Sequence, residues 1–412
     1  MVYEKRYPNG LRLVVKRMEG LLSVTMGILV GTGSSVETDK EDGISHFIEH
    51  MQFKGTKKRT SFEISDAFDR IGAQVNAFTG KDVTCYYSKC TSDHTAEAFE
   101  ILSDLFLNST FPDEEMVREK GVVCEEISMN EDTPDDLCFD LLSSAYYGNS
   151  GYGRNILGPA ANVKAFTRED IFRYKQERYC PGNIVVSFAG GIDLRTAETL
   201  VETYFDMPAA ETFRPRKKEI SLKHLSLIRT KPIEQVHIAI GYPSLPREHR
   251  LADALQTVNS VLGGSMSSRL FQEVREKLGL AYSVYSYVSA FQECGSLVIY
   301  AGVNPARADK AYEEIGKVVA GMRENGITRD EFLRGREQMK SSMLFSQEST
   351  PSQMLLYGKY MLFNDQIFDF EGKLDAINAV SEEDVREAIA LTFDESQKAV
   401  GAVGNTDKPF AL

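Results

Sequence analysis

The 412-residue chain lacks a basic charge balance, long apolar runs and closely paired cysteines. Its formal net charge of −13 argues against a nucleic-acid-binding protein, because such proteins need a basic surface. No apolar run comes close to the length of about 18 residues that a membrane-spanning helix needs. Residues 1–6 carry no apolar segment of the kind found in signal peptides. The six cysteines include no C-x-x-C pair, which favours thiols in a reducing compartment, so we expect a cytoplasmic protein with neither a membrane nor a nucleic-acid partner.

The composition is that of a globular protein, since 42% of the residues are hydrophobic and 26% are charged. The length exceeds that of one ordinary core and predicts two domains. The stretch 208–223 is polar, contains Pro208 and Pro215, and carries a basic run at residues 216–218. We therefore predict domains at 1–207 and 224–412, with 208–223 as the linker.

Only six histidines occur in the chain, yet two of them stand four residues apart in the segment His46-Phe47-Ile48-Glu49-His50. At about 100° per residue, a helix would bring His46, Glu49 and His50 to one face. The opposite face would be apolar, formed by Ile44, Phe47, Ile48 and Met51. Two histidines at i and i+4 can bind one Zn²⁺, and a carboxylate beside them can act on water. The alternative is a hydrogen-bonded polar face without metal, and the pattern favours the metal site.

An open zinc site needs a third protein ligand, and the acidic segment 112–127 offers candidates. On a helix, Glu119 and Glu126 lie about two turns apart and share one side. Glu125 points about 100° away from Glu126. Because an acidic helix face is ordinarily only solvated, this segment alone does not identify the third ligand.

Together these motifs resemble the inverzincins, the metallopeptidases of the pitrilysin and insulysin type. The similarity extends over essentially the whole chain and includes the stretches GISHFIEHMQFKGT (43–56), NAFTGKDVTCYY (76–87) and SSRLFQEVREKLGLAYSVYS (267–286). These stretches resemble the branch of the mitochondrial processing peptidases. In that family a Glu follows the second His at the distance that separates His50 from Glu126.

The resemblance implies one Zn²⁺ per chain, bound by His46, His50 and Glu126. It also implies that Glu49 is the catalytic base, which takes a proton from water and passes it to the leaving amine. Glu119 would orient a histidine ligand from the second coordination shell.

The resemblance further assigns residues to the peptide substrate. Asn76, Ala77 and Phe78 would form a sheet edge that accepts an extended peptide as an added strand. Arg275 and Tyr282 would reach the scissile carbonyl and stabilise the charge that develops on it. From the residues alone, the first set is an ordinary hairpin, Arg275 a surface charge and Tyr282 a strand aromatic.

Two glycine-rich segments need separate interpretation. Gly31-Thr32-Gly33 resembles the start of a dinucleotide-binding loop, but Val36 replaces the third glycine and no helix pattern follows, so we expect a plain loop. Gly263-Gly264 stands where non-catalytic processing-peptidase subunits have a longer glycine-rich loop. Because it is short here, an N-terminal helix cap is at least as good an interpretation as a role in substrate entry.

The second half of the chain repeats the pattern of the first. Residues 327–343 align without gaps with residues 111–127, which places Gly335 opposite Glu119 and Ser342 opposite Glu126. The second half also has no His-x-x-Glu-His, so an internal duplication is indicated in which only the first copy binds metal. The resemblance implies an α+β fold of two similar domains, each an antiparallel sheet packed with helices, together forming half of a clamshell.

The function that follows is a zinc-dependent endopeptidase acting on unfolded or short peptides, such as a processing peptidase. Two alternatives stay open: a non-catalytic structural subunit, or the catalytic half of a heterodimer with a zinc-less partner. One chain carries both the zinc residues and the Arg275/Tyr282 pair, so we expect a homodimer in which each protomer completes the site of the other.

Overall fold

The computed structural model describes residues 1–213, 220, 222–406 and 408–412. Of the linker predicted at 208–223, residues 214–219 and 221 therefore lie outside the described residues. The chain forms two compact units, each made from three separate stretches. As far as they are described, residues 1–127, 155–217 and 345–368 form the first unit, and residues 128–154, 218–344 and 369–412 form the second. The domain boundaries inferred from the sequence stay a prediction.

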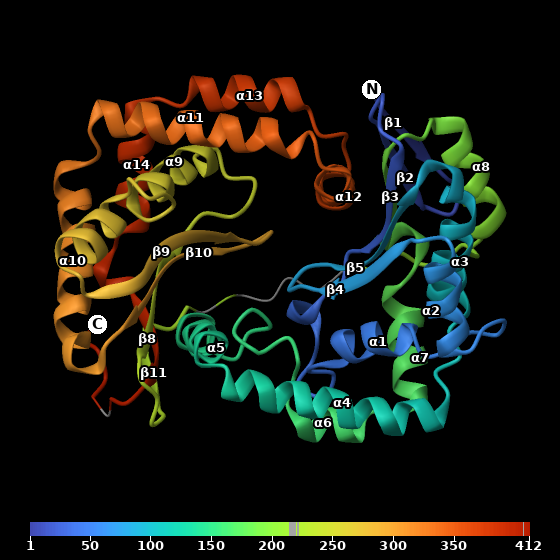
Figure 1. The fold of residues 1–412 in the computed structure, drawn as a ribbon, viewed down its shortest axis with the longest axis horizontal. Coiled ribbons are helices and arrows are strands. Elements are labelled where there is room, and N and C mark those ends of the chain that lie inside the picture. The colour runs from blue at the N-terminus through green and yellow to red at the C-terminus, as the bar shows by residue number, and fades with distance from the viewer. Residues whose placement is uncertain (214–219, 221, 407) are drawn as a thin grey trace. The chain divides into compact units, whose positions relative to one another are not determined.

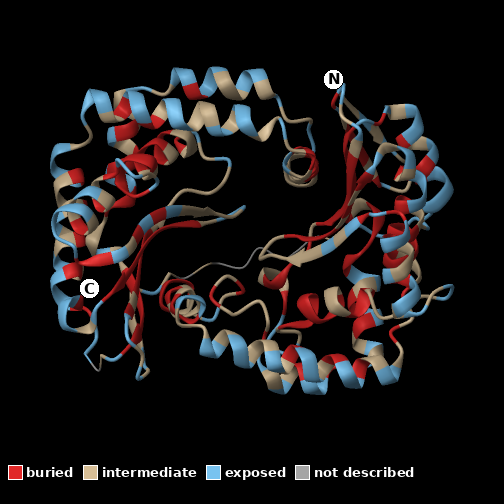
Figure 2. Ribbon diagram, in the orientation of Figure 1, coloured by how far each residue is buried: buried red, intermediate tan, exposed pale blue. Residues whose placement is uncertain are grey.

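The first unit is built on a six-stranded sheet (Figure 1). Its strands lie in the order β1-β2-β6-β3-β5-β4, with β2 and β6 parallel and the other neighbours antiparallel. They are β1 (Val2–Arg6), β2 (Arg12–Arg17), β3 (Ser23–Val30), β4 (Gln74–Thr79), β5 (Thr84–Thr91) and β6 (Ile184–Gly190). The strand β4 is an outer strand, and β3 and β6 are buried on both faces (Figure 2).

Helices from both halves of the chain cover this sheet. The residues Val24, Met26, Ile28 and Val30 of β3 alternate toward the main core, while Leu29 faces α12. The helices of this unit are α1 (Ile44–Gln52), α2 (Ser61–Arg70), α3 (Thr95–Asn108), most of α4 (Asp113–Asp132), α6 (Ala160–Ala165), α7 (Arg168–Arg178), α8 (Leu194–Tyr204) and α12 (Thr350–Asn364). A capping box formed by Thr60 and Glu63 begins α2.

The second unit repeats this topology with five strands in the order β7-β11-β8-β10-β9. The strands are β7 (Ser226–Thr230), β8 (Val236–Ser244), β9 (Ala281–Ala290), β10 (Gly295–Val303) and β11 (Ala399–Gly404). The helices are α5 (Pro134–Tyr147), α9 (Ala252–Leu262), α10 (Ala308–Asn325), most of α11 (Arg329–Ser346), α13 (Phe370–Ala379) and α14 (Glu382–Thr392). A further helical segment spans Phe271–Lys277.

Five strands of the first sheet, all except β1, correspond in order to the five strands of the second sheet, which supports the duplication inferred from the sequence. The order β2-β6-β3-β5-β4 corresponds to β7-β11-β8-β10-β9, and in each sheet the first two of these strands are the parallel pair. The alignment of residues 327–343 with residues 111–127 also agrees with the contacts that the two aligned helices make. Glu119 of α4 contacts His50 of α1, and Gly335 of α11 lies against Thr257 of α9. The predicted α+β class with two similar sheet-and-helix units is confirmed.

Each sheet is packed against one helix from the other half of the chain. The helix α12 lies on β2, β3 and β6, and α5 lies on β7, β8 and β11. Glycines allow this close approach: a Cβ on Gly401 of β11 would lie 2.4 Å from the Leu142 amide nitrogen of α5. On the first sheet, Ser187 Oγ donates a hydrogen bond to the Met354 carbonyl of α12 at 2.8 Å. Each half of the sequence thus supplies one helix that packs on the sheet formed by the other half.

Within the described part of the chain, no helix combines the length and apolar character needed to cross a bilayer.

Candidate metal centre

The helix α1 presents the two histidines, and its N-terminus is fixed from outside the helix. Gly43 precedes the helix with φ of 95°, and a Cβ there would lie 2.5 Å from the Leu157 carbonyl oxygen, so this position requires glycine. Because glycine cannot cap the helix with a side chain, the buried carboxylate of Glu37 accepts the backbone N–H groups of Gly43 and Ser45, both at 2.8 Å. Burial, the largest influence, raises the pKa of Glu37 to about 7. The apolar face of α1 is buried, as expected, through Ile44, Phe47, Ile48 and Met51.

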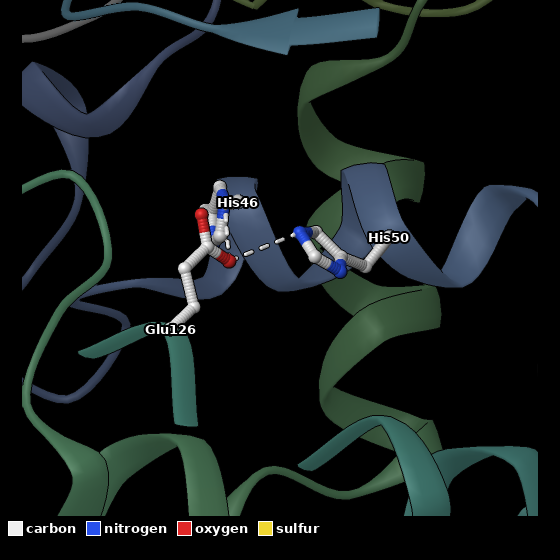
Figure 3. Close-up of side chains that lie close together, drawn as sticks. All are labelled: His46, His50 and Glu126. Carbon is white, nitrogen blue, oxygen red and sulfur yellow. Dashed lines mark ion pairs between the residues drawn. The ribbon is translucent and has the colours of Figure 1, made fainter. Parts of the chain in front are cut away.

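The side chains of His46, His50 and Glu126 converge between α1 and α4 (Figure 3). Glu126 Oε2 lies 3.6 Å from His46 Nε2 and 3.4 Å from His50 Nε2. One ligand atom from each residue lies within 4.8 Å of the others. Within the described part of the chain, these three residues form a group of side chains that could bind a metal ion. Ligand atoms about 2.0–2.2 Å from a tetrahedral Zn²⁺ are separated from each other by about 3.4 Å. The donor set and its spacing therefore fit a zinc ion.

His50 is oriented by a chain of polar contacts on the side away from Glu126. His50 Nδ1 lies 2.8 Å from Glu119 Oε1, and Lys54 Nζ lies 2.7 Å from Glu119 Oε2. With Nδ1–H donated to Glu119, Nε2 is directed toward Glu126 and is the ring nitrogen that can bind a metal once its own proton is lost. His46 differs, because its Nδ1 is buried with no hydrogen-bond partner among the described residues. Its ring is therefore positioned mainly by packing.

The two histidines have opposite pKa shifts. Burial and the neighbouring His50 lower the pKa of His46. Burial also lowers the pKa of His50, but its hydrogen bonds with Glu119 and Glu126 outweigh this effect and raise the pKa to about 9. The hydrogen bond with His50 lowers the pKa of Glu126. A metal ion must therefore displace a proton from His50 at neutral pH.

Glu49 lies on the same helix face as the two histidines. Burial is the largest influence on its carboxyl and raises its pKa, although a hydrogen bond from Thr79 opposes this shift. Thr79 Oγ1 donates to Glu49 Oε2 at 2.5 Å. No local sequence pattern relates Thr79 to Glu49, because Thr79 lies 30 residues further along the chain. Lys54, which follows the C-terminal end of α1 and pairs with Glu119, was also missed.

The residues predicted to bind substrate lie on outer strands, except Arg275, which lies on a helical segment. Asn76, Ala77 and Phe78 belong to β4, which pairs on one side with β5 and is the outer strand of the first sheet as described. Arg275 and Tyr282 belong to the second unit, on the segment Phe271–Lys277 and on the outer strand β9. The Arg275 guanidinium lies 5.4 Å from the centre of the Tyr282 ring, and Tyr282 is 77% exposed. These two residues are thus neighbours, whereas their part in a site with His46 stays a prediction.

The short glycine pair in the second half does not begin a helix. Gly263 instead ends α9, with its N–H donating to the Asn259 carbonyl. Residues 265–268, which follow the pair, lead into the helical segment that begins at Arg269, so an N-terminal cap within this stretch stays a prediction.

Comparison with known proteins identifies similar sequences and folds. A family model described as insulinase (peptidase family M16) matches residues 12–160, and one described as the peptidase M16 inactive domain matches residues 165–339. The Uncharacterized zinc protease YmxG of Bacillus subtilis (strain 168) is 42% identical over 95% of this chain and 96% of its own length. The Uncharacterized zinc protease SCO5738 of Streptomyces coelicolor (strain ATCC BAA-471 / A3(2) / M145) is 36% identical over 96% of this chain and 88% of its own length. The crystal structure of a protease from Helicobacter pylori, 21% identical, superposes with a TM-score of 0.90 over 98% of this chain and 99% of that chain, which shows a shared fold.

Proposed function

The chain belongs to peptidase family M16, and from this premise we propose that it is an active zinc endopeptidase that hydrolyses unfolded or short peptides, in the manner of a processing peptidase. The observation that carries the proposal is the convergence of His46, His50 and Glu126, with Glu49 on the same helix face. The match of residues 165–339 to a model described as an inactive domain is consistent with Gly335 standing where the first half has Glu119.

His46 and His50 through their imidazoles, and Glu126 through its carboxylate, would hold one Zn²⁺ per chain. Three protein ligands leave a position open, as in catalytic rather than structural zinc sites. When bound, zinc supplies a Lewis acid that increases the acidity of water and polarises a peptide carbonyl. Glu119, itself paired with Lys54, holds His50 in the required orientation.

Glu49 acts as the general base and then as the general acid. It accepts a proton from the attacking water and delivers it to the nitrogen of the leaving amine. Its raised pKa suits this exchange, because a carboxyl with a pKa nearer neutrality both accepts and returns a proton readily.

The peptide binds as a strand added to the outer edge of β4, along Asn76, Ala77 and Phe78. Arg275 and Tyr282 then stabilise the negative charge that develops on the scissile carbonyl oxygen. We assign this pair to the partner protomer of a homodimer, so that two-fold pairing creates two equivalent sites. The scattered cysteines favour a reducing compartment, and we place the enzyme in the cytoplasm.

The proposal is tested by digesting a peptide library with the full chain loaded with zinc and reading the masses of the products. Internal cleavage is expected that stops when a chelator is added and returns when zinc is restored. A zinc-loaded protein that leaves the library intact would contradict the proposal, as would cleavage that a chelator does not affect.

A further inference from the structure

The catalytic base is held by a side chain from outside the metal-binding helix. We propose that Thr79, the last residue of β4, is a positioning residue that sets the orientation of the Glu49 carboxylate for proton transfer. This inference rests on the proposed function, since it takes Glu49 as the base. Its geometric basis is the hydrogen bond of 2.5 Å from Thr79 Oγ1 to Glu49 Oε2.

A carboxylate in a partly buried site needs a hydrogen-bond donor to hold its charge and its direction. Glu49 has three flexible side-chain bonds and could otherwise adopt several orientations. The bond from Thr79 occupies one oxygen and fixes the plane of the carboxylate. The second oxygen, Oε1, is then the atom that can exchange the proton with substrate water.

The hydroxyl of Thr79 can fix Glu49 only if Thr79 is itself fixed, and the turn after β4 supplies this. The turn is closed by the Gly80 N–H, which donates to the Val83 carbonyl at 2.8 Å. It is docked to the loop after β3 by two further backbone bonds. The N–H groups of Ser34 and Ser35 donate to the carbonyls of Gly80 and Lys81 at 3.1 and 2.9 Å.

This docking explains the glycine-rich segment that resembles a dinucleotide-binding loop. A Cβ on Gly33 would lie 2.2 Å from the Gly80 carbonyl oxygen and 2.5 Å from that of Lys81, so a side chain there would push the turn away. Gly33 thus permits two backbones to touch, and the short turn Ser34–Val36 follows it as part of a plain loop, as expected. The loop after β3 therefore holds the β4–β5 turn in place, and the fixed turn positions the hydroxyl of Thr79.

The same strand therefore serves two purposes. The edge of β4 that is proposed to pair with the peptide ends at the residue that orients the base. Loss of the Thr79 hydroxyl should accordingly slow proton transfer without changing zinc binding or the pairing of peptide with β4. This distinguishes positioning from a general structural role, which would change stability or zinc affinity as well.

Three substitutions test the role of the hydroxyl. Thr79→Val removes it while conserving shape, and Thr79→Ser retains it. Thr91→Val is the matched control, because Thr91 ends the adjacent strand β5 and is exposed. For Thr79→Val we expect kcat to fall about tenfold to a hundredfold, the effect of misplacing one catalytic group. KM should stay within about twofold, zinc affinity should equal that of the wild type, and Thr79→Ser should retain most of kcat.

A crystal structure of each zinc-loaded protein gives a readout that does not depend on turnover. We expect one Glu49 rotamer in the wild type and in Thr79→Ser, and a rotated or divided carboxylate in Thr79→Val. If Thr79→Val does not fold, Thr79→Ala replaces it in both measurements. The inference is overturned if the hydroxyl-free variant keeps the wild-type rotamer or kcat, or if Thr79→Ser or Thr91→Val loses as much. If the wild type shows no zinc-dependent cleavage, the proposed function fails, and the rotamer of Glu49 still decides the role of Thr79.

Discussion

Replacing Glu119 by Gln should weaken zinc binding although Glu119 is not a ligand. Its side chain is only 5% exposed and bonds with His50 Nδ1 through one oxygen and with Lys54 through the other. Gln keeps the size of the side chain but loses the charge, and its amide nitrogen cannot accept a hydrogen bond. Either His50 or Lys54 then loses its acceptor, and in both cases His50 loses the negative charge that its Nδ1–H group faces.

The magnitude follows from the place of Glu119 behind a ligand. Removing such a partner typically reduces metal affinity about tenfold to a hundredfold, which corresponds to about 1.4–2.7 kcal/mol. The loss should depend on pH. In the wild type, the hydrogen bonds with Glu119 and Glu126 outweigh burial and raise the pKa of His50 to about 9, so a proton competes with zinc below that pH. Without Glu119 the pKa of His50 falls and this competition weakens, so the loss of affinity should be smaller at about pH 7 than at about pH 9.5.

The assay is competition for zinc against a coloured chelator of known affinity, at both pH values. Glu114→Gln is the matched control, because Glu114 lies on the same helix and its side chain is 90% exposed. The reasoning is refuted if Glu119→Gln binds zinc as tightly as the wild type at both pH values. It is also refuted if Glu114→Gln loses as much affinity, or if the deficit is larger at neutral than at alkaline pH.

Three further predictions concern the base, the assembly and the fold. Glu49→Gln should keep its zinc, measured by metal analysis, while turnover falls about a hundredfold or more; near-normal turnover would exclude Glu49 as the base. Mixing the inactive variants Glu49→Gln and Tyr282→Phe under subunit exchange should restore about a quarter of wild-type activity, because half of the dimers become mixed and each of these has one intact site; no recovery after proven exchange would argue against sharing. Gly401→Ala should lower the free energy of unfolding, measured with urea, by about 3 kcal/mol, because its Cβ would meet the backbone of α5. Gly27→Ala would meet only the flexible side chain of Met354 and should cost about 1 kcal/mol, and equal losses would contradict this account.

The helix with His46 and His50 could be predicted because its signal is local. Apolar and polar residues alternate at helical spacing, and the histidines stand one turn apart. The choice of Glu126 over Glu125 as the third ligand depended on the spacing from the second His that is typical of the family. Helical periodicity alone placed Glu119 and Glu126 on one side of the helix and did not decide which residue binds the metal. The structure brings Glu126 to both histidines, and Glu125 is an exposed residue.

Contacts between distant parts of the chain could not be read from periodicity. Nothing local in the segments of α5 and α12 states which sheet each helix covers. This packing depends on glycines such as Gly401, which have meaning only once a helix lies against them. Thr79 was missed for the same reason, since its hydrogen bond to Glu49 joins the end of β4 to α1. The turn that follows Thr79 is held by the close approach of Gly33, which is also a contact between distant parts of the chain.

The most direct test of the account is the zinc content of two neighbouring variants of α4. The wild-type chain should carry one zinc ion, Glu126→Gln should lose it, and Glu125→Gln should retain it, because only Glu126 faces His46 and His50. Metal analysis of the purified full-length proteins decides the matter. A wild type without zinc, or zinc lost with Glu125→Gln and retained with Glu126→Gln, would contradict the assignment of this site.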